Sequence, residues 1–191
     1  QVEPKVLFCA DGYRYNGKSF DSLARVAEVC GAIDSIAKVI VVPHISENPD
    51  ISALPKGLLW GDALDNGATE VAFAQLPFDH PLYILYSSGT TGVPKCIVHS
   101  AGGTLLQHLK EQRLHSDIKT GDRLFYFTTC GWMMWNWLVS GLASGATLLL
   151  YDGSPFVGRG NILFDYAEAE GMTHFGTSAK FIDAIAKINL A

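Results

Sequence analysis

Apolar runs typical of strands alternate along the chain with segments of helical periodicity, and short stretches rich in Gly, Pro or polar residues separate them. The run Lys38-Val39-Ile40-Val41-Val42 is β-branched and unbroken until Pro43, which predicts a strand buried on both faces. Similar short apolar runs predict further strands at residues 6–9, 82–86, 96–98, 124–128, 146–151 and 173–175, with one more near 58–60.

Five segments predict helices. In residues 23–30 apolar side chains occupy positions i, i+3, i+4 and i+7, with Asp21 or Ser22 as the expected N-cap and Gly31 just past the expected end. The other helical patterns lie at residues 105–114, 132–143, 164–170 and 179–188.

Turn signals and prolines divide the N-terminal half of the chain. The dipeptides Asp11-Gly12 and Asn16-Gly17 tolerate the positive φ of tight turns, so they predict a short β-ribbon around Tyr13-Arg14-Tyr15. Residues 43–81 hold most of the prolines and few clear periods, which is typical of a connecting loop. Strands and helices that alternate through short linkers predict an α/β fold, with a largely parallel sheet covered by helices.

Composition narrows the classes of partner. Fourteen Lys and Arg against nineteen Asp and Glu leave a net charge of −5, so there is no broad cationic field for a nucleic acid or an anionic membrane. No apolar stretch reaches the roughly 18 to 20 residues that a membrane span needs. Four widely spaced cysteines predict buried thiols in a reducing, cytoplasmic compartment. We also expect a piece of a longer protein, because the last helical pattern is unfinished at Ala191.

The most distinctive stretch is YSSGTTGVPK, residues 86–95, directly behind an apolar run. Gly89 and Gly92 let the backbone approach a ligand closely, hydroxyls and amides can donate to phosphate oxygens, and Lys95 supplies a positive charge. The spacing does not match a Walker A motif. On composition alone, a polyphosphate site and an ordinary Gly-rich surface turn both remain open.

A resemblance to a known superfamily rests on this string and on the CIVHS that follows it. Together they resemble the phosphate-binding signature of adenylate-forming enzymes, which include acyl-CoA synthetases, nonribosomal-peptide adenylation domains and luciferases. Three other stretches are similar to the acetoacetyl-CoA synthetase branch, namely KVLFCADGYRYNGKSFDSL, TTCGWMMWNWLVSGLASGATLLLYDGSPF and THFGTSAKFIDA. One departure is Cys96, where the superfamily commonly has Gly, and it puts only the local backbone geometry in doubt.

The resemblance implies that residues 1–191 are part of the N-terminal domain of an adenylate-forming enzyme, with no C-terminal domain in the chain. Residues 1–81 would carry the first strand and helix units with their connecting loop, and residues 82–191 the phosphate loop and acyl pocket. Adenine-binding, ribose-binding and second-step groups have no counterpart in residues 96–191, so the isolated chain is expected to be inactive. The turn at Lys119–Asp122 is interpreted as a helix-to-strand connection and not as the ribose site.

The activity implied is that of an acetoacetate–CoA ligase. Acetoacetate would attack the α-phosphate of ATP with loss of pyrophosphate, and the thiol of CoA would then displace AMP. Lys95 and Thr91 would act in catalysis, with Thr91 reaching Mg²⁺ through the phosphates. The residues that would hold the β- and γ-phosphates are Ser87, Ser88, Gly89, Thr90, Thr91, Gly92 and Lys95. The alternatives are another short-chain acyl-CoA synthetase and a non-catalytic nucleotide- or polyanion-binding domain. The sequence carries no signal for an oligomeric state.

The apolar block Trp132-Met133-Met134-Trp135 is the expected substrate pocket. Met133 and Met134 align with acyl-pocket positions of acetyl-CoA synthetases, whereas the residues by themselves also suit a buried core helix. The 3-oxo group of acetoacetate should need a hydrogen-bond donor, for which Trp132, Trp135 and the Asn136 amide are the candidates within the chain.

Three further polar residues have weaker expectations attached to them. His99 is expected to pack against its neighbours or to cap the following helix, and His174 to be structural. Ser178 is a candidate for a ligand contact.

Overall fold

The computed structural model describes residues 2–87 and 92–187, which divide into two compact units, residues 1–73 and 74–191. The boundary lies before the expected one at residue 81. Residues 74–80 belong to the second unit because backbone N–H groups at the start of its first helix donate to Phe78 O (2.9 Å) and His80 O (2.8 Å). Each unit is described by itself.

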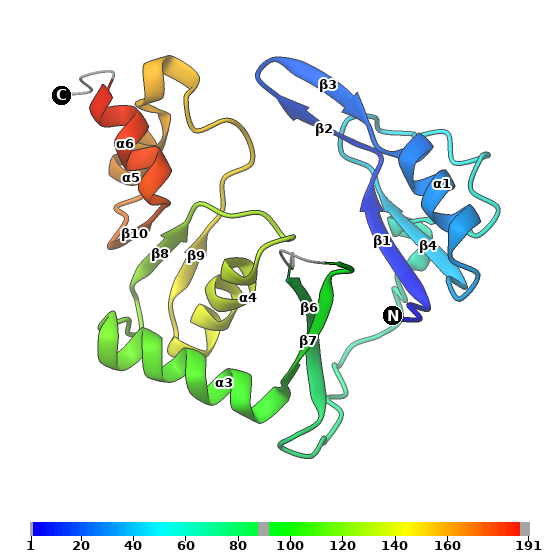
Figure 1. The fold of residues 1–191 in the computed structure, drawn as a ribbon, viewed down its shortest axis with the longest axis horizontal. Coiled ribbons are helices and arrows are strands. Elements are labelled where there is room, and N and C mark those ends of the chain that lie inside the picture. Colours follow the sequence, from blue (N-terminus) through cyan, green and yellow to red (C-terminus); the bar gives the residue numbers. More distant parts are fainter. Residues whose placement is uncertain (1, 88–91, 188–191) are drawn as a thin grey trace. The chain divides into compact units, whose positions relative to one another are not determined.

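A three-stranded parallel sheet forms the centre of the first unit (Figure 1). Strand β4 (Lys38–Val42) lies between β1 (Val6–Ala10) and β5 (Gly57–Leu59), and a short helix α2 (Trp60–Ala63) follows β5. Val39 and Val41 are fully buried beneath helix α1, whereas Lys38 and Val42 on the other face are exposed. The expected burial of β4 on both faces is therefore wrong for this unit, because its described elements cover only one face of the sheet.

Helix α1 (Leu23–Ala32) covers that buried face through Val26 and its half-buried apolar neighbours. The Asp21 carboxylate accepts a hydrogen bond from Ala24 N (3.0 Å), so Asp21 caps the helix and Ser22 does not. The helix also continues through Gly31 to Ala32, slightly beyond its expected end.

The β-ribbon near the N-terminus forms around Asn16-Gly17. Strands β2 (Gly12–Tyr15) and β3 (Lys18–Asp21) pair antiparallel, and both turn residues have positive φ, 49° and 73°. The chain before Asp11-Gly12 is not part of this ribbon, because β1 pairs in parallel with β4. The turn dipeptides thus predicted the β2–β3 ribbon correctly. They did not predict that β1, the strand before it, pairs with β4.

The second unit begins with a hairpin of β6 (Pro81–Ser87) and β7 (Lys95–Ser100), which pair antiparallel. Helix α3 (Ala101–Lys110) follows β7 directly and ends in one π-helical turn, η1 (Glu111–His115). The apolar residues Leu82, Ile84 and Tyr86 of β6 are exposed, so this apolar run forms a strand without being buried in the described unit. In the described part of the chain the hairpin joins no larger sheet, and α3 contacts both its strands.

A second parallel sheet has the order β10-β8-β9. Leu124 and Phe125 of its central strand are both buried and point to opposite faces. Leu138 covers the Leu124 face, and α5 and α6 cover the Phe125 face (Figure 1). The elements of this part of the unit are β8 (Arg123–Tyr126), α4 (Met133–Val139), η2 (Ser140–Ser144), β9 (Thr147–Leu149), η3 (Val157–Gly160), α5 (Ile162–Ala169), β10 (His174–Gly176) and α6 (Ala179–Lys187).

The α/β class and the parallel pairing predicted from the sequence are thus confirmed, with two antiparallel ribbons in addition. Cys9, Cys30 and Cys96 are half-buried, and Cys130, in the connection between β8 and α4, is exposed. The expected burial of the cysteines is therefore met only in part by the first three and is wrong for Cys130. Within the described ranges, no helix combines the length and the apolar character that a membrane crossing requires.

Candidate functional site

The hairpin brings the two ends of the Gly-rich loop together. Ser87 is the last residue of β6 and lies opposite Lys95, the first residue of β7. Gly92 has a φ of +104°, and a Cβ added there would meet nothing within 4 Å. Lys95 is exposed, so its ammonium group is available to an anion. The expected ligand residues Ser88, Gly89, Thr90 and Thr91 lie outside the described residues.

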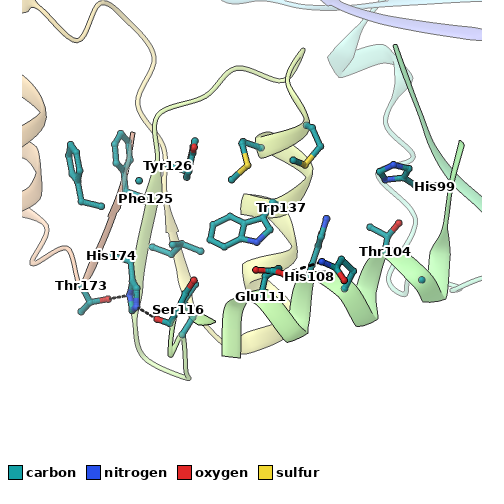
Figure 2. Close-up of a pocket in the computed structure, with 18 of the residues that line it drawn as sticks. His99, Thr104, His108, Glu111, Ser116, Phe125, Tyr126, Trp137, Thr173 and His174 are labelled. Carbon is teal, nitrogen blue, oxygen red and sulfur yellow. Dashed lines mark hydrogen bonds between the residues drawn. The ribbon is translucent and has the colours of Figure 1, made fainter. Parts of the chain in front are cut away.

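A cavity of about 1050 Å³ lies on the side of the second sheet that faces α3 and α4 (Figure 2). Residues of β7, α3, η1, β8, α4 and β10 line it. The wall from α4 consists of Met133, Met134 and Trp137, and the indole of Trp137 packs against the ring of Tyr126 with their centroids 6.1 Å apart. This combination of apolar walls with a few polar groups is typical of a small-molecule site.

The structure separates the four residues of the expected substrate pocket. Met133 and Met134 line the cavity, but Trp132 is 70% exposed and is not among the lining residues. Trp135 packs against the core cluster around Leu138. Asn136 is not a lining residue either. None of the three expected donors to a 3-oxo group therefore faces this cavity.

Two buried polar residues on α3, which the sequence patterns did not single out, also line the cavity. Thr104 and His108 are one helical turn apart and both are more than nine-tenths buried. Figure 2 shows them on the side of α3 that faces the cavity. The sequence does contain a signal for this pair. Thr104 and His108, beside Leu105 and Leu106, are spaced i, i+4, and polar residues one turn apart share a face of a helix.

Hydrogen bonds determine the protonation of His108. Its Nδ1 lies 2.8 Å from Ser140 Oγ, and that hydroxyl donates to the backbone oxygen of Asn136 (3.0 Å). Ser140 therefore accepts from His108 Nδ1–H, which leaves Nε2 as a lone-pair acceptor in the neutral ring. Burial, followed by the nearby His99, lowers the pKa of His108 below its ordinary value and favours this neutral form.

We expect this part of the second unit to lose stability as the pH falls below about 6.5, the ordinary histidine pKa. The unfolded chain binds a proton at His108 between that value and the lowered folded pKa, so stability rises with pH across this window. The other titratable groups lining the cavity are His99, Glu111, Tyr126 and His174. Hydrogen exchange of residues 101–115 at pH 7.5 and 5.5 measures the effect in the full-length protein, and His108→Asn should reduce the difference. An equal difference in the variant would contradict the prediction.

Two of the three polar residues with weaker expectations, His174 and Ser178, have structural partners. His174 Nε2–H donates to Ser116 O (2.9 Å) and its Nδ1 lies 2.9 Å from Thr173 Oγ1, which agrees with the structural role expected. Ser178 Oγ accepts from Phe181 N (3.2 Å) at the start of α6, so the serine serves as a helix cap. His99 lines the cavity instead of capping α3.

The turn before β8 is stabilised by the side chain of Asp122, which accepts from Lys119 N (2.8 Å), and by Gly121 at a φ of +90°. This geometry agrees with the helix-to-strand connection expected there. Across the described ranges, no group of three or more His, Cys, Asp or Glu side chains is placed to hold a metal ion.

Comparison with known proteins shows which family the chain resembles. The model of the AMP-binding enzyme family matches residues 1–191. An acetoacetyl-coenzyme A synthetase of Rhizobium meliloti (strain 1021) is 57% identical over 189 residues, covering 98% of this chain and 29% of the relative. Malonamoyl-CoA synthetase vrtB of Penicillium aethiopicum is 44% identical over 202 residues, covering 97% of this chain and 28% of the relative.

A solved structure has the same fold. The acetoacetyl-CoA synthetase from Streptomyces lividans superposes with a TM-score of 0.87 at 48% identity, over 98% of this chain and 28% of that one. The chain thus spans less than a third of the length of these relatives. Because the family model covers every residue, the chain belongs to the AMP-binding enzyme family.

Proposed function

We propose that this chain is the part of an acetoacetate–CoA ligase that holds the β- and γ-phosphates of ATP and forms a wall of the acid pocket. One observation carries the proposal. Strand β7 begins at Lys95 and its end, His99 and Ser100, lines the same cavity as Met133 and Met134. Four residues of strand span about 13 Å, so one rigid element would link a phosphate-binding cation to this cavity.

The chemistry divides into two steps. In the first, a carboxylate oxygen of the acid attacks the α-phosphorus, and the bond to the bridging oxygen breaks with release of pyrophosphate. Lys95 would neutralise charge on the departing phosphates, and Ser87 with the Gly-rich loop would orient them. Mg²⁺ would bind these phosphates, with Thr91 as the proposed residue beside it. In the second step the sulfur of CoA attacks the acyl carbon, AMP leaves, and the thiol proton is released.

The choice of acid rests on the cavity and on the relatives. Met133 and Met134 supply an adaptable apolar wall, which suits the methyl end of a short chain. The relatives are named for acetoacetyl-CoA and for malonamoyl-CoA, and both acyl groups carry a carbonyl at the third carbon. We therefore propose a short 3-oxo acid, acetoacetate, as the substrate.

We also propose a cytoplasmic location. Cys9 and Cys30 pack against the core of the first unit, and burial raises the pKa of the Cys9 thiol, which favours its protonated and less reactive form. Such thiols suit a reducing compartment.

The proposal predicts the products and the acid preference of the full-length protein that contains this chain. With ATP, Mg²⁺ and CoA, acetoacetate should yield acetoacetyl-CoA and AMP, and its kcat/KM should exceed those of acetate, butyrate and hexanoate. Thioester formation by chromatography and acid-dependent exchange of pyrophosphate into ATP measure the two steps. As a control, residues 1–191 alone should form no thioester.

Each alternative has its own outcome in this experiment. A preference for butyrate or hexanoate would indicate another acyl-CoA synthetase. Binding of ATP without exchange for any acid would indicate a non-catalytic nucleotide-binding domain. Turnover by residues 1–191 alone would contradict the proposal that this chain supplies only part of the active site.

A further inference from the structure

The hydroxyl of Tyr126 has no partner within the described fold. Tyr126 is the last residue of β8, is half-buried and lines the cavity. Its hydroxyl bonds to no described residue and, unlike the hydroxyl of Thr104 on α3, it is not sealed from solvent. The carboxyl end of a parallel strand is also where open α/β sheets bind their ligands. This hydroxyl is therefore accessible to a ligand in the cavity.

Packing holds the Tyr126 ring in one place. The indole of Trp137 packs edge-on against it, at an interplanar angle of 66°. Gly176 lies opposite Tyr126 on the neighbouring strand β10, and a Cβ added at Gly176 would come within 2.2 Å of the Tyr126 ring. The missing side chain at Gly176 thus leaves the space that the ring occupies. A ring held in this way presents its hydroxyl in a fixed position, which lowers the entropy cost of a hydrogen bond to a ligand.

Ser100 also brings a hydroxyl to the cavity lining, at the junction of β7 and α3. Its Oγ lies against the first turn of α3, 2.6 Å from the position of a Cβ added at Gly103. Ser100 and His99 end the strand that begins at Lys95, so in the proposed function they belong to the element that holds the phosphates. The third carbon of the acid points away from the phosphates, which makes both residues less suited to bind it.

The other polar side chains of the lining are engaged or lie elsewhere. His108 uses its Nδ1–H on Ser140 and presents an acceptor at Nε2. Thr173 Oγ1 donates to the backbone oxygen of Arg123. Figure 2 shows Ser116 next to His174, apart from Tyr126, and it shows Tyr126 on the same side of the cavity as Trp137. Tyr126 is therefore the donor that adjoins the wall from α4.

We infer that the Tyr126 hydroxyl donates a hydrogen bond to the 3-oxo oxygen of the acid and thereby distinguishes a 3-oxo acid from the saturated acid of the same length. This inference rests on the proposed function and deepens it. Trp137, which contacts the Tyr126 ring, is one helical turn from Met133, so the hydroxyl adjoins the wall proposed to hold the acyl end. Tyr126 is a specificity-determining residue, since the reacting carboxyl group is at the other end of the acid.

The test compares Tyr126→Phe with the wild type in the full-length protein, with acetoacetate and butyrate as acids. Phenylalanine keeps the ring that packs against Trp137 and removes only the hydroxyl. We expect the ratio of kcat/KM for acetoacetate to that for butyrate to fall about tenfold, the effect of losing one hydrogen bond between neutral groups. The value for butyrate should stay near that of the wild type, because butyrate has no oxygen on its third carbon.

Controls separate recognition from packing and from the competing hydroxyl. Tyr166→Phe removes a hydroxyl that donates to Leu150 O (3.1 Å) outside the cavity lining, and it should leave the ratio unchanged. Ser100→Ala should not change the ratio either, whatever its effect on the two separate values. Tyr126→Phe should leave the unfolding midpoint unchanged, because the Tyr126 hydroxyl has no partner in the described fold.

The outcomes distinguish this inference from the proposed function. An unchanged ratio in Tyr126→Phe, or an equal loss of kcat/KM for both acids, would overturn the inference, as would a fall in the ratio in Ser100→Ala alone. If the wild type prefers acetoacetate and Tyr126→Phe keeps that preference, the function stands and the inference fails. If the wild type does not activate acetoacetate, both fail.

Discussion

Lys95→Ala in the full-length protein is expected to lower acid-dependent pyrophosphate exchange by about 10²- to 10³-fold, the usual effect of removing one preorganised charge-stabilising group. Lys95 is exposed at the first position of β7, where the hairpin holds its backbone opposite Ser87. Its ammonium group can therefore neutralise phosphate charge that develops as pyrophosphate leaves. Transfer from preformed acetoacetyl-adenylate to CoA should be nearly unaffected, because no pyrophosphate is present in that step.

A matched cation provides the control for this prediction. Lys119 is also exposed, and its ammonium group forms an ion pair with Asp117 (2.7 Å) in the turn before β8. Lys119→Ala removes the same charge from the same unit and should leave exchange at the wild-type level. Lys95→Arg should recover part of the activity, since the charge is kept but the shape is not. Unchanged exchange in Lys95→Ala would show that β7 does not present a phosphate-binding group.

Asp11→Ala is expected to destabilise the first unit by about 3 kcal/mol, because it leaves several backbone donors without their charged acceptor. Asp11 is 3% exposed at the end of β1. Its Oδ1 accepts from His44 N (2.7 Å) and Ile45 N (3.1 Å), and its Oδ2 accepts from Ser46 N (2.9 Å). The carboxylate thus holds the loop that follows β4. Hydrogen exchange on residues 38–50 of the full-length protein measures the change.

The pH dependence of this effect has a definite sign. Burial tends to raise the pKa of Asp11, but the hydrogen bonds from Ile45, His44 and Ser46 together prevail and lower it. As the pH falls, the unfolded chain therefore binds a proton at Asp11 before the folded chain does. The stabilisation is complete above about pH 3.8, the ordinary pKa of this carboxyl group, and is lost as the pH falls toward the folded pKa. The difference between wild type and Asp11→Ala should therefore shrink below pH 4.

An exposed aspartate that makes a similar bond is the control. Asp50 accepts from Ser52 N (2.9 Å) at the surface, and Asp50→Ala should change exchange little because water can replace its carboxylate. Asp11→Asn keeps one oxygen acceptor and should be milder than Asp11→Ala. Equal effects of Asp11→Ala and Asp50→Ala on hydrogen exchange would show that burial of the Asp11 carboxylate contributes nothing to the stability of the first unit.

The sequence by itself determined the features that depend on neighbouring residues. The periodic positions located nearly all the strands and helices, because side-chain spacing of two or 3.6 residues is a local property of the backbone. The Asn16-Gly17 turn could be recognised in the same way, since the tendency to positive φ is encoded in two consecutive residues. The Gly-rich composition of residues 86–95 left a polyphosphate site and a surface turn both open. The resemblance of residues 86–100 to a known signature indicated the family.

Only the tertiary structure decided which distant residues meet. The pairing of β1 with β4 brings Asp11 to residues 44–46, a contact that no local pattern contains. In the apolar block after Gly131, no helical face could be chosen from the sequence, because every side is apolar. Packing against the sheet directs Met133 and Trp137, one turn apart, into the cavity and Trp135 into the core. The orientation of α3 likewise decides that Thr104 and His108 line the same cavity, because a helix presents to a cavity whichever face its neighbours leave uncovered.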